Sequence, residues 1–299
     1  MKQASPARKK ALLVKALVAV CGSAGSVCVL LMAPTWGVCI FLSVVAALAA
    51  YEFTTATRFV THRYLVVLSV LQAVGVIWAA AYHLAPVWWG MWLFAAFLLA
   101  FTPAVFTEKA AGAHEGAAAV FAAFVPSGIT ALFLYLMQLE NGRLLLLAPL
   151  VAAWAADSLA LLGGMAFGKH KLCPRVSPNK TVEGFFCGIL GGALGMLIYA
   201  LILRACGHGV SLPLFIGVGA VGALFGALGD LTFSAVKRSV GIKDFGTFMP
   251  EHGGVLDRFD SVLFALPVCV LAFSLFPLAE LPRRVYHIKR KKVTTWNTF

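Results

Sequence analysis

Long apolar stretches alternate with short polar segments along this chain. Since about 20 apolar residues cross the hydrocarbon core of a bilayer, each such stretch predicts a transmembrane helix. The pattern predicts about nine of them, at residues 11–32, 35–53, 64–83, 86–106, 116–138, 144–167, 184–204, 211–236 and 261–279. The first two are separated by a short boundary and the sixth contains Asp157, so eight or ten helices stay open. The predicted fold is an all-α polytopic integral membrane protein.

Composition agrees with a membrane environment. The 299 residues are 61% hydrophobic and 12% charged, with a mean hydropathy of +0.90, which is too apolar for an ordinary water-soluble domain. The net charge of +12 comes from basic residues between apolar stretches, where they orient the chain and meet anionic headgroups. We therefore expect the lipid bilayer, and no nucleic acid, as a partner. The seven cysteines form no CxxC pair and are interpreted as small buried apolar residues.

Lysine and arginine gather in alternate polar segments, which predicts the orientation of the chain. The basic segments are residues 1–10, 54–63, 107–115, 169–181 and 237–260. They all lie on one side of the membrane, which the positive charge predicts to be the cytoplasmic side, so the amino terminus is expected to be cytoplasmic. With nine helices the basic tail falls on the other side, against the charge rule.

Three regions follow from this pattern. Residues 1–140 hold about five helices that serve as a scaffold or for dimerisation. Residues 141–281 hold catalytic helices and two charged cytoplasmic loops, and residues 282–299 form the basic tail.

The aspartates mark where chemistry is expected. All five lie within 104 residues of the second half: Asp157, Asp230, Asp244, Asp257 and Asp260. Asp157 and Asp230 lie in or at the end of apolar stretches, where an unpaired carboxylate costs several kcal/mol. Such residues are functional candidates.

Helical spacing predicts which charged groups share a face. If the eighth helix continues past Asp230, then Ser234, Lys237 and Arg238 follow on its face. Asp257 and Asp260 face the same way if "LDRFDS" begins the last helix. Charge pairs within the helices, including a pair with Arg258, remain an alternative, but adjacent carboxylates more often recruit a divalent cation. Hard oxygen ligands favour Mg²⁺, which binds through one or two carboxylates and substrate phosphates.

Two loops could bind phosphate. "EHGGV" carries Gly253 and Gly254, whose backbone allows close approach of an anion. "SPNKTVEG" places Lys180 just before a helix N-terminus, which favours phosphate. For the first loop the alternative is a solvated loop without a ligand. For the second it is a basic loop that only orients the chain in the membrane.

These residues closely resemble the signature of the phosphatidate cytidylyltransferase (CDP-diacylglycerol synthase) family. The signature S-x-x-K-R-x4-K-D-x-G-x3-P-x-H-G-G-x-x-D-R-x-D is filled by Ser234, Lys237, Arg238, Lys243, Asp244, Gly246, Pro250, His252, Gly253, Gly254, Asp257, Arg258 and Asp260. "SPNKTVEG", Gly229-Asp230 and Glu52 also resemble family motifs. Leu161 and Val182 depart from the aromatic and the tryptophan that are common in the family. The resemblance covers about 157–261.

The resemblance implies transfer of a cytidylyl group from CTP to phosphatidic acid, giving CDP-diacylglycerol and pyrophosphate for phospholipid synthesis. It implies one or two Mg²⁺ ions held by Asp230, Asp257 and Asp260. The expected catalytic residues are Asp230, Lys237, Arg238, Asp257, Arg258 and Asp260. The expected substrate-binding residues are Arg175, Ser177, Lys180, Thr181, Ser234, Lys243, His252, Gly253 and Gly254, with a structural hydrogen bond as the alternative for His252.

Other interpretations remain open at this point. A CDP-archaeol-type synthase or polyprenol kinase would share the charge placement but use another acceptor lipid, although the long signature disfavours the kinase. A transporter or channel would distribute its carboxylates through several helices. We expect a bacterial inner (plasma) membrane, an active site that faces the cytoplasm, and a chain that could form a homodimer.

Overall fold

The computed structural model describes residues 22–106, 111–246 and 253–276. Its long helices are α2 (Thr35–Ala56), α3 (Arg63–Ala81), α4 (Pro86–Phe106), α5 (Ala113–Gln138), α7 (Ala148–Phe167), α8 (Val182–Ala205), α9 (Leu212–Ser239) and α10 (Leu256–Leu275). Shorter elements are a helix at Gly22–Met32, α6 (Gly142–Leu145), β1 (Lys171–Cys173) and β2 (Ser177–Thr181).

The all-α polytopic fold is confirmed. Among the described residues, eight helical stretches are long and apolar enough to cross a membrane, with α6 and α7 counted together as Gly142–Phe167. The first predicted span, 11–32, lies partly outside the described residues, and its described part is the helix Gly22–Met32. The last helix begins at Leu256 and not at 261, because the charged "LDRFD" forms its first turns.

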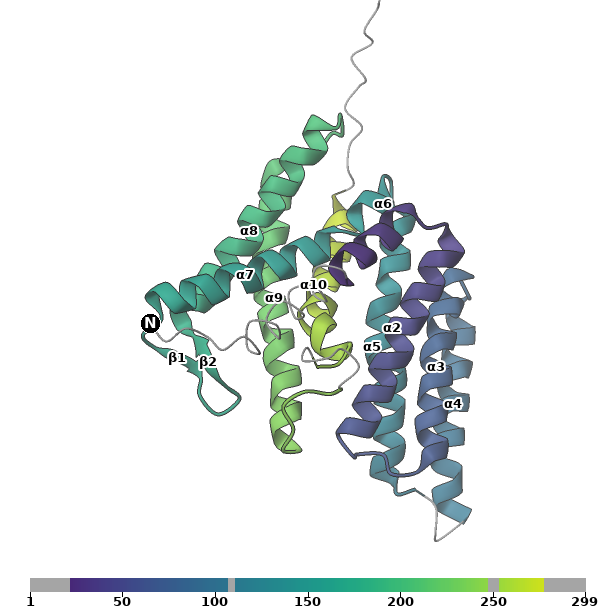
Figure 1. The fold of residues 1–299 in the computed structure, drawn as a ribbon. Coiled ribbons are helices and arrows are strands. Elements are labelled where there is room, and N and C mark those ends of the chain that lie inside the picture. Colours follow the sequence, from purple (N-terminus) through teal and green to yellow (C-terminus); the bar gives the residue numbers. More distant parts are fainter. Residues whose placement is uncertain (1–21, 107–110, 247–252, 277–299) are drawn as a thin grey trace, which may run out of the picture.

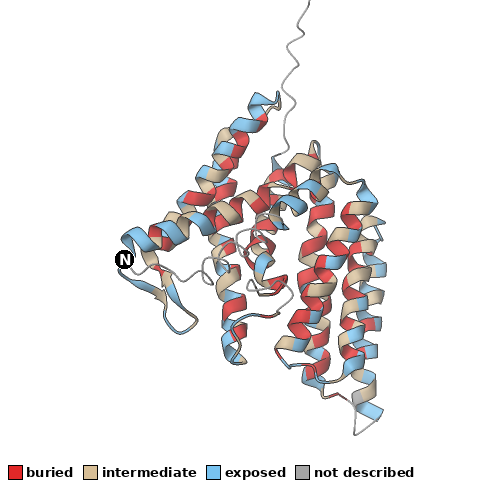
Figure 2. Ribbon diagram, in the orientation of Figure 1, coloured by how far each residue is buried: buried red, intermediate tan, exposed pale blue. Residues whose placement is uncertain are grey.

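The helices form two groups joined by α10 (Figure 1). Helices α2, α3, α4 and α5 run side by side as one bundle, while α8 packs against both α7 and α9. Helix α10 contacts α9 and α7 on one side and α5 and α2 on the other. Buried and exposed positions alternate along the helices (Figure 2). Many of the exposed side chains are large and apolar, as expected when lipid surrounds the helices.

Glycines set the distance between α8 and α9. A Cβ atom on Gly192 would collide with the carbonyl oxygen of Gly219, and one on Gly219 would collide with that of Gly192. The two backbones therefore touch, which is the close packing that small residues permit between membrane helices.

Polar segments from distant parts of the chain meet at one end of the molecule. The carboxylate of Glu52 on α2 accepts from the backbone N–H of Leu256 at the start of α10. At the same end, Arg238 on α9 donates to the carbonyl of Val176 between the two strands. The contact of Arg238 thus joins the predicted basic segments 169–181 and 237–260, and the N–H of Thr61 donates to Glu115, which joins 54–63 to 107–115. Residues 1–10, 107–110, 247–252 and 282–299 lie outside the described residues.

The basic loop after α7 is a short hairpin, which the hydropathy pattern did not predict. Strands β1 and β2 pair antiparallel, with Lys171 opposite Thr181 and Cys173 opposite Ser177. The N–H of Val176 donates to the carbonyl of Cys173 at 3.2 Å, closing a turn that has proline at its second position. The strands are too short to produce a periodic hydrophobic signal, so the sequence predicted only a loop.

Candidate functional site

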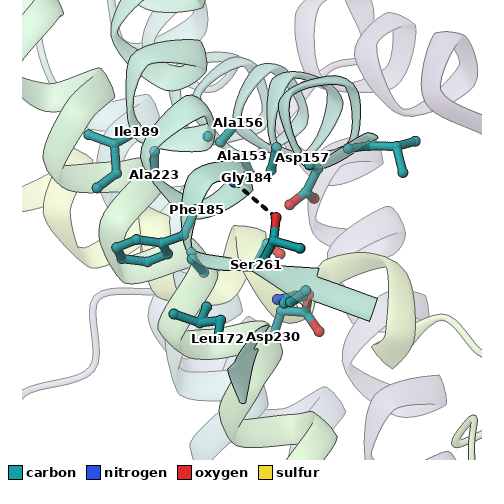
Figure 3. A pocket seen from close by; sticks show the side chains of 18 of the residues that line it. Ala153, Ala156, Asp157, Leu172, Gly184, Phe185, Ile189, Ala223, Asp230 and Ser261 are labelled. Carbon is teal, nitrogen blue, oxygen red and sulfur yellow. Dashed lines mark hydrogen bonds and ion pairs between the residues drawn. The ribbon is translucent and has the colours of Figure 1, made fainter. Parts of the chain in front are cut away.

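A cavity of about 530 Å³ lies between α7, α8, α9 and the hairpin, with Ser261 of α10 in its lining. Figure 3 shows Asp157 of α7 and Asp230 of α9 at this cavity. Its charged and polar lining residues are Asp157, Asn179, Lys180, Thr181, Asp230 and Ser261; the others are apolar or glycine. The cavity is therefore amphipathic, with its charged groups contributed by α7, β2 and α9.

Small side chains create this volume. Ala156, Gly188 and Gly226 line the cavity from three different helices, so the helices lie close together while their side chains leave space. The first turn of α8 is fixed beside it, because the hydroxyl of Thr181 accepts from the N–H of Gly184 at 3.1 Å. This N-cap places Lys180 at the cavity.

Lys180 and Asp230 form an ion pair at the cavity. Lys180 Nζ lies 2.5 Å from Asp230 Oδ2, and the side chains are 29% and 26% exposed. The hydroxyl of Ser234 donates to Asp230 Oδ1 at 3.1 Å, as expected if α9 continues past Asp230. The pair joins the hairpin to α9 and remains accessible to solvent.

Lys237 and Asp257 form a second pair, away from the cavity lining. Lys237 Nζ donates to Asp257 Oδ1 at 2.7 Å, and the side chains are only 8% and 4% exposed. Asp257 Oδ2 accepts from the backbone N–H of Phe245 at 2.8 Å and of Gly254 at 3.0 Å. Both oxygens of this predicted metal ligand therefore have protein partners, and the pair ties the segment before α10 to α9.

Asp157 has a place that the sequence did not assign. Its carboxylate is repelled by that of Asp230 and attracted by the ammonium group of Lys180. The carboxylate of Asp260 is close enough to be repelled by those of Asp157 and Asp230. Asp260 is buried, and its Oδ1 accepts from the N–H of Ser261 at 2.7 Å. Within the described residues, no group of three or more His, Cys, Asp and Glu side chains is close enough to hold a metal ion. Its apolar surroundings in the sequence marked Asp157 as a functional candidate without a role, and the structure places it at the cavity.

The other predicted site residues are spread around this end of the molecule. Arg238 binds the carbonyls of Val176 and Ile242, and Arg258 lies within electrostatic range of Asp157. Three others flank these contacts: Ser177 begins β2, and Arg175 and Lys243 are exposed.

Gly253 and Gly254 lie just before α10 and contribute to the conformation of the backbone there. Gly253 adopts φ +81°, a left-handed conformation that favours glycine. Gly254 donates to Asp257. His252 lies outside the described residues.

Comparison with known proteins gives consistent matches. Residues 14–276 match the cytidylyltransferase family. The chain is 44% identical over 141 residues to a phosphatidate cytidylyltransferase of Staphylococcus epidermidis. It is 44% identical over 142 residues to that of Staphylococcus aureus and 43% over 142 residues to that of Staphylococcus saprophyticus. Each alignment covers 47% of this chain, and the chain spans about half the length, 53%, of these curated relatives.

Proposed function

The chain belongs to the cytidylyltransferase family, and from this premise we propose that it transfers a cytidylyl group from CTP to phosphatidic acid. In this reaction a phosphate oxygen of phosphatidic acid attacks the α-phosphorus of CTP. The bond from that phosphorus to the α,β-bridging oxygen breaks, and pyrophosphate leaves. The products are CDP-diacylglycerol and pyrophosphate.

The amphipathic cavity is the observation that carries the proposal. Lys180, Asp230 and Asp157 bring both charge signs to a space whose remaining lining is largely apolar, between helices that cross a membrane. A phosphorylated lipid has the same division between a charged headgroup and apolar chains.

The residues of the cavity suit a reaction that needs alignment more than proton transfer. The attacking phosphate oxygen is already an anion, so no strong general base is required. Lys180 would neutralise a substrate phosphate once its contact with Asp230 opens, and Ser234 would keep the freed Asp230 carboxylate oriented.

The donor set fits Mg²⁺. Asp157 and Asp230 offer hard oxygen ligands at the cavity and Asp260 lies within electrostatic range of both. Since Mg²⁺ commonly takes one or two protein carboxylates and completes its shell with water and phosphate, a closed cage of three acids is not needed. When bound, the ion would stabilise charge on the α-phosphate and the departing pyrophosphate. Asp257 is less suited to this role, because Lys237 and two backbone N–H groups already bind it.

A labelling experiment tests the reaction and separates it from its alternatives. Purified protein is given phosphatidic acid, Mg²⁺ and CTP labelled at either the α- or the γ-phosphate. We expect lipid-soluble label from the α-position only. Label from the γ-position would indicate a lipid kinase, and absence of lipid label from both would refute the proposal. Replacement of phosphatidic acid by an ether-lipid phosphate tests the archaeol-type alternative.

The orientation in the membrane is tested separately. We propose a bacterial plasma membrane and a cytoplasmic cavity, because the hairpin segment is basic and the segment between α8 and α9 contains no lysine or arginine. An impermeant thiol reagent added to intact cells should then label Cys206 and leave Cys173 unlabelled in single-cysteine variants. Labelling of Cys173 from outside would reverse the orientation.

A further inference from the structure

Glu52 lies on α2, in the N-terminal bundle, yet its carboxylate contacts the start of the last helix. The residue is 4% exposed. Its Oε1 accepts from the N–H of Val255 and its Oε2 from the N–H of Leu256, both at 2.9 Å. The N–H groups at a helix start have no partners within the helix, and the helix dipole favours an anion there. Glu52 thus acts as the cap of α10 from 203 residues away.

Two glycines enclose this carboxylate. A Cβ atom on Gly246 would lie 2.6 Å from Glu52 Oε1, and a Cβ atom on Gly254 would collide with Glu52 Oε2. The backbone on both sides of residues 247–252 therefore lies directly against the carboxylate. A side chain at either glycine would push the loop or Glu52 out of place.

The contact lies where α10 begins, and the site residues of α10 follow within its first turns. Ser261 lines the cavity one and a half turns into α10, after Asp257 and Asp260. On the side of α10 that faces α9, Gly229 packs near the carbonyl of Asp260 and Gly226 near that of Ser261. The first turns of α10 are therefore held between a carboxylate from α2 and a glycine face of α9.

We propose that Glu52 is a positioning residue, through which the N-terminal bundle holds Ser261 at the cavity and Asp260 beside it. The expected effect on kcat rests on the proposed function. The contact itself can be tested by a measurement that does not require turnover. Glu52 does not line the cavity. Its effect must pass through the first turns of α10.

Glu115 provides a matched control within the same chain. It is also buried, at the start of α5, and accepts from the N–H groups of Thr61 at 2.7 Å and His62 at 3.2 Å, just before α3. Both glutamates thus accept from two backbone N–H groups at a helix start, and Glu115 also binds the Thr61 hydroxyl and the His62 ring. Glu115 serves a helix that contributes no residue to the cavity lining.

The experiment compares Glu52→Gln and Glu115→Gln in the full chain in detergent. Amide hydrogen exchange is followed for residues 253–261, together with kcat, the Mg²⁺ concentration at half-maximal turnover, and melting temperature. For Glu52→Gln we expect exchange at Val255 and Leu256 to accelerate by roughly tenfold or more and kcat to fall by roughly tenfold, with a higher Mg²⁺ requirement. Glu115→Gln should lower the melting temperature without these changes, and Glu52→Asp should recover part of the protection and of kcat.

Several outcomes would overturn the proposal. These are unchanged exchange at Val255 in Glu52→Gln, wild-type kcat in that variant, or equal kcat losses per folded molecule in the two glutamine variants. If Glu52→Gln does not fold, Glu52→Asp gives the same comparison, and wild-type exchange and kcat in it would count against the proposal. If the wild type transfers no cytidylyl group, the proposed function fails, while the exchange data still decide whether Glu52 holds the start of α10.

Discussion

Two lysine–aspartate pairs at the same end of the molecule have the same chemistry and different surroundings. Lys180 and Asp230 line the cavity with more than a quarter of each side chain exposed. Lys237 and Asp257 are almost fully enclosed, and backbone N–H groups bind the remaining carboxylate oxygen. The first pair can exchange partners with water and ligands, whereas the second cannot do so without opening the fold.

The difference is one of solvation. An exposed ion pair contributes roughly 0–1 kcal/mol, so a substrate phosphate and a cation can replace its partners at little cost. When a buried pair loses one partner, the other charge remains unpaired in a medium of low dielectric, at a cost of roughly 3–5 kcal/mol. We therefore propose that the pair at the cavity takes part in catalysis and that the buried pair stabilises the loop before α10.

The largest expected effect follows from removal of charge at the cavity. Asp230→Asn and Asp157→Asn should each lower CDP-lipid formation by about a thousandfold, or about 4 kcal/mol of transition-state stabilisation. Their melting temperatures in detergent should stay close to that of the wild type, because both groups border a cavity. Lipid-linked product is measured against Mg²⁺ concentration. Near-normal turnover in both variants would remove the cavity carboxylates from the mechanism.

Asp257→Asn tests the buried pair. The substitution leaves Lys237 buried without its partner and should lower the free energy of unfolding by roughly 3–5 kcal/mol. Folded molecules that remain should keep an ordinary Mg²⁺ dependence. The measurements are the detergent melting curve and turnover per folded molecule. An unchanged melting curve with lost turnover would instead support the sequence-based prediction that Asp257 binds the metal.

Lys180→Met should have the smallest effect. Loss of one charge-assisted contact to a phosphate should lower kcat/KM by about 2 kcal/mol, while stability changes by less than about 1 kcal/mol. Lys237→Met is the matched control and should show the reverse order of effects. If kcat/KM is unchanged in Lys180→Met, the lysine serves only to orient the chain in the membrane.

Much of the fold could be predicted because the thickness of the bilayer sets the length of each apolar stretch, and that length can be read from the sequence. The spans predicted at 35–53, 64–83 and 86–106 correspond to α2, α3 and α4. Local spacing also predicted that Asp230 and Ser234 share a face of α9, and their hydroxyl–carboxylate contact is present. The roles of the site residues stay predictions, since they concern bound substrates.

Partner choice could not be read from spacing. The sequence places Lys237 seven residues after Asp230, yet Lys237 binds Asp257 and Asp230 binds Lys180 of the hairpin. Each ion pair joins segments that are distant in the chain. The two loops contain several other acidic and basic residues, so the sequence alone does not say which of them pair.

By itself the sequence determined the membrane environment, the positions of the helices and the segments that carry the charge, because these depend on local hydropathy and residue type. Only the tertiary structure decided that Asp157 lies at the cavity, that Asp257 is enclosed, and that Glu52 caps α10. Each of these depends on which helices meet and on how much water remains between them. Solvation distinguishes an exchangeable ion pair from a structural one, and it is a property of the packed helices rather than of any one of them.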